Sequence, residues 1–107
     1  MVQSKVGSYI GFCKKAGKIT LGSSAINTLK GGVYLLMMDG NSAKNSLRYA
    51  IKFKNKFSCP LLVCKENFEQ LTGKPLCRLV AIRDKSLAEA ILNSGDTNYE
   101  LYTGGGE

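Results

Sequence analysis

Few residues of this chain could carry out acid–base or nucleophilic chemistry. The 107 residues include no histidine, the side chain that most readily exchanges protons near neutral pH. No carboxylate pair stands out for catalysis, because Glu89 is expected to cap a helix and Asp84 lies at a strand-to-helix junction. A cysteine nucleophile would lack its histidine, and neither GxGxxG nor a Walker A motif occurs. We therefore expect that the protein is not an enzyme and has no small-molecule substrate.

The four cysteines could hold a metal ion, but their spacing does not favour one. They are Cys13, Cys59, Cys64 and Cys77. No CxxC pair is present, and the nearest two cysteines are separated by Pro60 and an apolar segment. Zinc sites are typically built from such pairs and from histidine. We expect buried, reduced thiols, with no metal and no cofactor.

Positive charge is concentrated in the first half of the chain. Fifteen Lys and Arg against eight Asp and Glu give a net charge of +7, with a pI near 9.4. Residues 1 to 58 hold ten basic residues and one acid, Asp39, whereas residues 59 to 107 hold five basic residues and seven acids. A basic half of this kind is typical of proteins that bind a polyanion, since counterions are released on binding. The alternative interpretation is a surface that only confers solubility.

One segment before a helix start has groups that could bind a phosphate. Residues 17–24 combine Lys18 with the hydroxyls of Ser23 and Ser24, next to the exposed N–H groups of the helix start. An ordinary helix cap explains the same residues equally well.

Two further segments could bind nucleic acid. Lys and Arg recur every four residues along one predicted helix and could follow a sugar–phosphate backbone, or simply form its solvated face. They are Lys44, Arg48, Lys52 and Lys56. The loop of residues 73–78 joins a glycine and two cations to an apolar centre, which could pack on unstacked bases. A well-packed connection is the alternative for this loop.

These segments must be positioned by an alternation of helices and strands. Hydrophobic periodicity predicts helices at about residues 3–15, 23–30, 42–55, 67–71 and 86–92, and strands at 19–21, 33–38, 61–64 and 79–82. The pattern predicts an α/β fold, a three-layer α/β/α sandwich with a central mixed sheet of about four strands. The order of the strands does not follow from the pattern.

Polar residues and glycines predict where several of these elements begin and end. Gly17 is expected to end the first helix, and Ser23 or Ser24 to cap the second. Residues 39–42 are expected to form a turn that also caps the third helix. Ser86 and Glu89 have the spacing of a capping box for the last helix, which should stop near Gly95.

The chain is expected to form one domain with a short tail. Residues 1–95 form the α/β/α domain, and residues 96–107 are polar and glycine-rich, as is typical of a flexible tail. The longest apolar run, Val33 to Met38, is far shorter than the roughly 20 residues that span a bilayer. The first residues also lack the apolar region of a signal peptide. These features predict a cytoplasmic protein without a membrane partner.

Three stretches of this sequence, taken in order, are similar to a known family. They are GFCKKAGKITLG, GGVYLLMMDGNSAKNSL and LTGKPLCRLVAIRDKSLAEAI. In type and spacing they resemble the kink-turn RNA-binding ribosomal proteins of the L-seven-Ae and L-thirty-e family, and most of all their small bacterial paralogues. The likeness covers residues 4 to about 93.

The resemblance implies an α/β/α sandwich that docks on a sharply bent RNA stem. Two segments would contact the RNA, the glycine turn with the start of the second helix and the loop before the last strand. On this sequence they match Gly22, Ser23, Ser24, Ala25 and Thr28, and Lys74, Pro75, Leu76 and Cys77. Lys18, Lys30 and Arg78 would add contacts to phosphates.

This sequence departs from strong RNA binders of the family at three positions. Ser24 and Ala25 replace an Asn-Glu pair, and Thr28 replaces a lysine. We therefore expect weaker and more salt-sensitive binding of a kink-turn-like structured RNA, by a ribosomal or ribosome-associated protein whose partners include ribosomal proteins. The alternatives are a protein–protein adaptor on the same fold and an accessory domain that acts beside an RNA-modifying enzyme.

Overall fold

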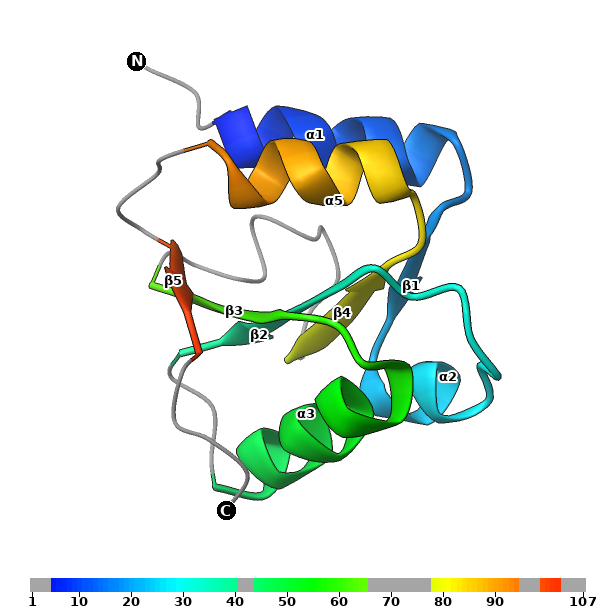
Figure 1. Ribbon diagram of the computed structural model, residues 1–107, viewed down its shortest axis with the longest axis vertical. Helices are drawn as coiled ribbons and strands as arrows, with labels where there is room; N and C mark the ends of the chain where they lie inside the picture. The colour runs from blue at the N-terminus through cyan, green and yellow to red at the C-terminus, as the bar shows by residue number, and fades with distance from the viewer. Residues whose placement is uncertain (1–4, 41–43, 66–77, 95–98, 103–107) are drawn as a thin grey trace.

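Helices and strands alternate along the computed structural model, which describes residues 5–40, 44–65, 78–94 and 99–102 (Figure 1). The helices are α1 (Lys5–Lys15), α2 (Ser23–Asn27), α3 (Lys44–Phe57) and α5 (Lys85–Leu92). The strands are β1 (Ile19–Leu21), β2 (Leu35–Asp39), β3 (Leu61–Cys64), β4 (Leu79–Ile82) and β5 (Tyr99–Leu101). None of the helices within these ranges has the length and apolar character needed to cross a membrane.

The strands form one mixed sheet in the order β1-β4-β2-β3-β5. The β2–β3 pair is parallel, while β1–β4, β2–β4 and β3–β5 are antiparallel. In the antiparallel β2–β4 pair, Met38 lies opposite Leu79. In the sheet order, β4 lies between β1 and β2, although it follows both of them and β3 in the chain.

Among the described helices, α1 and α5 cover one face of the sheet and α2 and α3 cover the other (Figure 1). Successive strand residues point to opposite faces, so Leu35 and Met37 pack below α1 and α5 while Leu36 and Met38 pack against α2 and α3. Both faces of β2 are buried, which explains its unbroken apolar run. The predicted three-layer α/β/α sandwich is confirmed, with one strand more than expected.

The first helix ends at a glycine, as predicted. Gly17 has φ of +67°, a conformation that side chains with a Cβ adopt rarely. The N–H of Lys18 donates to the carbonyl of Cys13 at 2.8 Å, and the N–H of Gly17 donates to the carbonyl of Lys14 at 3.2 Å. This pair of bonds is a Schellman motif. The Arg83 guanidinium adds a bond of 2.7 Å to the Gly17 carbonyl.

The predicted caps of the two short helices are wrong. Gly22 is the N-cap of α2, with φ of +91° and no side-chain bond, so Ser23 already lies inside the helix. Asp84 is the N-cap of α5, where its Oδ1 accepts a hydrogen bond from the N–H of Leu87 at 2.9 Å. Ser86 therefore lies in the first turn of α5 and does not cap it.

Several element boundaries also differ from those predicted. The second helix stops at Asn27, where the Thr28 hydroxyl and N–H both donate to the carbonyl of Ala25. The third helix continues to Phe57 and is followed by Ser58 with φ of +52°. The last helix begins at Lys85, one residue earlier than predicted, and ends at Leu92, as predicted. The predicted helical turn at 67–71 lies outside the described residues.

Part of the expected flexible tail is a strand. Tyr99 pairs with Cys64 and Glu100 with Val63, which adds β5 to the outer edge of β3. The Tyr99 side chain is 9% exposed and packs with the core beneath α1 and α5, while Glu100 forms an ion pair of 3.4 Å with Lys65. Burial of this aromatic ring offsets the cost of ordering the segment.

Three of the cysteines are buried as free thiols within the described residues: Cys13, Cys59 and Cys64. Burial raises the pKa of Cys59 from about 9 to about 11. Burial, with a smaller effect of the Asp84 carboxylate, also raises the pKa of Cys13. These two thiols therefore stay protonated near neutral pH.

Candidate nucleic-acid interface

Three backbone hydrogen bonds form a row across one end of the sheet. The N–H of Gly22 donates to the carbonyl of Leu79 at 2.8 Å, and the N–H of Asp39 donates to the carbonyl of Arg78 at 3.0 Å. The N–H of Gly40 donates to the carbonyl of Cys64, also at 2.8 Å. The row therefore links the ends of β1, β4, β2 and β3. We call the side chains around it, Gly22–Ala25 and Arg78, the Gly22–Arg78 surface.

The glycine turn supplies the first part of this surface. Ser24 and Ala25 are exposed, and Gly22 and Ser23 are half-buried. None of the described residues has an atom within 4 Å of the position that a Gly22 Cβ would occupy. Thr28 is also exposed, but its hydroxyl donates to the carbonyl of Ala25 at 2.6 Å. The turn itself is held next to the start of β4 by the hydrogen bond from Gly22 to Leu79.

Arg78 supplies the second part. Its Nη1 lies 3.0 Å from Oδ2 of Asp39, and the exposed fractions of the two side chains are 44% and 7%. The guanidinium carries five N–H donors in a planar fork, and the Asp39 bond uses one side of it. Because the pair is neutral overall, Arg78 presents directed donors rather than net positive charge.

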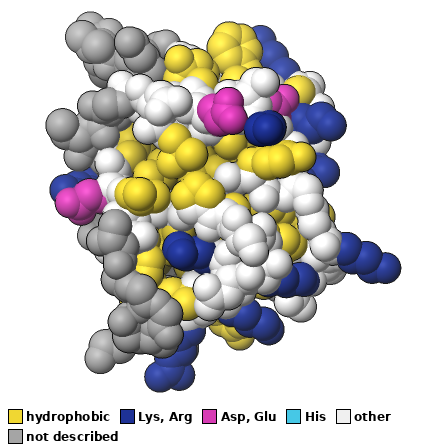
Figure 2. Space-filling view, in the orientation of Figure 1, with side chains coloured by type: hydrophobic (Ala, Val, Ile, Leu, Met, Phe, Trp, Pro, Cys, Tyr) yellow, Lys and Arg dark blue, Asp and Glu magenta, His cyan; other side chains and the backbone are white. Residues whose placement is uncertain are grey.

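Net positive charge comes instead from α3, which contains five Lys and Arg and no acid. Arg48, Lys52 and Lys56 are exposed along it, as the predicted stripe requires, and Tyr49 beside them is 50% exposed. The Lys56 ammonium lies 3.4 Å from the carbonyl oxygen of Asn27 and so connects α3 to α2. Figure 2 shows Lys and Arg side chains mainly along the right and lower rim of the molecule. The side chain of Lys44 lies outside the described part of the chain.

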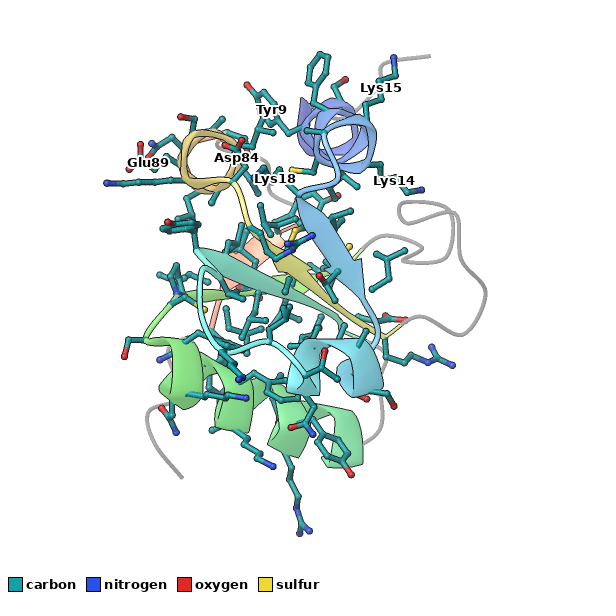
Figure 3. All side chains as sticks on the ribbon, turned by 90° about the vertical axis from the view of Figure 1, so that its right-hand side faces the viewer. Tyr9, Lys14, Lys15, Lys18, Asp84 and Glu89 are labelled. Atoms are coloured by element: carbon teal, nitrogen blue, oxygen red, sulfur yellow. The ribbon has the colours of Figure 1, made fainter. Side chains whose placement is uncertain are left out.

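Two predicted phosphate contacts lie away from this surface. Lys18 is at the other end of β1, where its carbonyl accepts a bond of 2.7 Å from the N–H of Arg83. Figure 3 shows Lys18 near Asp84, in the layer of α1 and α5. Lys30 is exposed beyond the C-terminal end of α2, in the connection back to β2. The structure therefore brings Gly22–Ala25 together with Arg78 but separates Lys18 and Lys30 from them.

The predicted loop residues Lys74, Pro75, Leu76 and Cys77 lie outside the described residues. Arg78, which follows them in the chain, is exposed on the Gly22–Arg78 surface. This arginine is therefore the described residue through which that prediction can be examined.

Sequence reasoning assigned Asp39 and Gly40 to a turn, and this was wrong for Asp39. Asp39 is the last residue of β2 and is buried beneath Arg78. A Cβ on Gly40 would lie 2.8 Å from the Cys64 carbonyl oxygen, so only glycine fits there without a shift. One signal could have identified Asp39, because it is the single acid among residues 1–58 and directly follows an apolar run.

Comparisons with known proteins give a structural likeness without a function. No protein-family model and no curated protein matches the chain. A solved structure of a protein of unknown function from Bacillus halodurans superposes with a TM-score of 0.70 and 13% sequence identity. The superposition covers 86% of this chain and 97% of the other. At this identity the likeness establishes a shared α/β fold.

Proposed function

We propose that this chain binds structured RNA of the kink-turn type through the Gly22–Arg78 surface and the neighbouring basic face of α3. One contact carries the proposal. The N–H of Gly22 donates to the carbonyl of Leu79 at 2.8 Å, and Leu79 is bonded in the chain to Arg78, the residue that follows the predicted RNA-binding loop. The family resemblance assigns RNA contact to the glycine turn and to the loop of Lys74–Cys77, which directly precedes Arg78 and lies about fifty residues from the turn in the chain.

The chemistry of the two regions suits an RNA backbone. The cations of α3 would release counterions from phosphates, which supplies affinity that depends on salt but not on base sequence. Arg78 offers directed N–H donors, and Ser24 offers an exposed hydroxyl. Gly22 has no side chain, so a ribose or phosphate can approach its backbone closely.

A bent stem fits this division of roles better than a straight duplex does. The donors of the Gly22–Arg78 surface occupy a small area, whereas the exposed cations of α3 extend over two turns from Arg48 to Lys56. An RNA with a sharp bend can bring bases and backbone to the first region and a flanking helix to the second. In this proposal the protein is ribosomal or ribosome-associated, and ribosomal proteins are its neighbours.

The test is a titration of the protein against a kink-turn RNA and a straight duplex of equal length at two salt concentrations. We expect tighter binding to the kinked RNA, with Arg78→Ala weakening it by about tenfold, the usual effect of losing a charge-assisted contact. Lys74→Ala should also weaken binding, because the resemblance implies that its loop contacts the RNA. Lys85→Ala, which removes an exposed cation from α5, is the matched control and should have little effect.

Equal binding to both RNAs, or binding to neither, would contradict the proposal. A role as a protein–protein adaptor would then take precedence, and exposed apolar side chains favour it. Phe12 is 57% exposed and Leu101 is 52% exposed, and Figure 2 shows apolar side chains gathered across the middle of the visible face. If the protein is an adaptor, Ser23→Ala and Ser24→Ala should leave RNA binding unchanged.

A further inference from the structure

We propose that Asp39 is a positioning residue, whose buried carboxylate holds the Arg78 guanidinium so that its outward donors meet the RNA. This inference rests on the proposed function, because it concerns how Arg78 is presented to that ligand. It adds to the RNA-binding surface an acid that touches no RNA.

The contrast in burial between the two side chains supports this role. The Asp39 side chain is 7% exposed and the Arg78 side chain 44% exposed, with 3.0 Å between Oδ2 and Nη1. One end of the guanidinium is therefore anchored inside the protein while the other faces solvent. A free arginine loses much rotamer freedom when it binds, so an arginine already held in place binds at a lower entropic cost.

The backbone around Asp39 makes the anchor rigid. Asp39 ends the central strand β2, and its N–H donates to the carbonyl of Arg78 itself, at 3.0 Å. The next residue, Gly40, donates to Cys64 of β3 at 2.8 Å. A Cβ at Gly40 would lie only 2.8 Å from the Cys64 oxygen, so a side chain at this position would push the end of β2 away from β3. The backbone that carries the carboxylate is thus held on both sides, by Arg78 on one and by Cys64 of β3 on the other.

Charge alone would argue against an acid at this place. Asp39 is the single acid among the first 58 residues, and a bare carboxylate near the proposed interface would repel phosphate. Removal of Asp39 should therefore strengthen RNA binding if only net charge mattered. A positioning role predicts the opposite sign, and this difference separates the two explanations.

The experiment is a double-mutant cycle with Asp39→Asn, Arg78→Ala and the double variant. Affinity for the kink-turn RNA is measured by fluorescence anisotropy, and the folded fraction by circular dichroism at the same temperature. We expect Asp39→Asn to weaken binding by about fivefold although it adds a positive increment to the net charge, as for other coupled neighbours. In the Arg78→Ala background the same change should have no effect.

Unchanged or tighter binding by folded Asp39→Asn would overturn the inference, as would an equal loss in the Arg78→Ala background. If Asp39→Asn does not fold, the affinity of Arg78→Lys is the test. This variant keeps the buried carboxylate paired but replaces the planar guanidinium by a point charge. Loss of affinity in that variant supports positioning, and full affinity overturns it. If the wild type itself does not prefer kinked RNA, the proposed function fails first and the positioning role fails with it.

Discussion

At the scale of single residues, two glycines fix the end of the sheet for different physical reasons. Gly22 has φ of +91°, and no described residue crowds its Cβ position, so it is the backbone conformation that requires glycine there. Gly40 has no left-handed φ, but the Cys64 carbonyl occupies the space that a Cβ would need. The first glycine directs the chain into α2, and the second lets β2 and β3 approach.

The second requirement can be measured. Gly40→Ala should lower the free energy of unfolding by about 2 kcal/mol, because the new Cβ forces the two strand ends apart and disturbs the Gly40–Cys64 hydrogen bond. Urea denaturation followed by circular dichroism gives the value. Gly31→Ala is the control and should be nearly neutral, since no atom of the part of the chain that the structure describes lies within 4 Å of its Cβ position. Equal stability of the two variants would show that a Cβ at Gly40 can be accommodated at the end of β2 without cost.

At the scale of helices and strands, periodic apolar residues predicted the elements well and single polar residues predicted their ends poorly. The strands at 61–64 and 79–82 were predicted at their observed bounds. The start of α5 was not, because Asp84 and Ser86 are both good N-caps and local sequence does not decide between them. Pairing next to the sheet selects Asp84 as the N-cap. The N–H of Arg83 still bonds to the Lys18 carbonyl, and Asp84 is the next residue in the chain.

The cap of α5 gives a prediction at this scale. Asp84→Ala should lower the free energy of unfolding by about 1 kcal/mol, because the Leu87 N–H loses its acceptor at the helix start. Ser86→Ala should change it by less than about 0.5 kcal/mol, as for an ordinary exposed position. Thermal and urea denaturation of both variants provide the comparison. A larger loss for the serine variant would mean that the helix begins two residues later.

At the scale of the whole molecule, the sequence could not predict the contacts that depend on the order of the strands in the sheet. Lys18 is only four residues from Gly22, yet β1 separates the two by about 13 Å at the usual rise of an extended chain. Asp39 and Arg78 are far apart in the chain, and only the β2–β4 register brings them together. The three residues of β5 are too few to show a period, and their pairing with β3 alone identifies them as a strand.

The place of β5 in the molecule can be tested through its aromatic residue. Tyr99→Ala should lower the free energy of unfolding by about 3 kcal/mol, because the ring is 9% exposed and packs in the core under α1 and α5. Leu101→Ala, at a position 52% exposed on the same strand, should cost less than about 1 kcal/mol. Urea denaturation curves of the two variants give both values. If Tyr99→Ala were as mild as Leu101→Ala, the segment would behave as the flexible tail that its composition indicates.

The position of β4 between β1 and β2 also sets the order in which the molecule can assemble during synthesis. Both of its neighbours leave the ribosome first, but they have no contact in the sheet until residues 79–82 arrive between them. Each of these pairings spans many residues, which slows folding because long loops must close. The Gly22–Leu79 and Asp39–Arg78 bonds therefore form late, and a nascent chain that lacks β4 cannot display the surface they create. A ligand of the Gly22–Arg78 surface therefore binds only chains in which β4 has joined the sheet. By mass action it stabilises these folded molecules against unfolding.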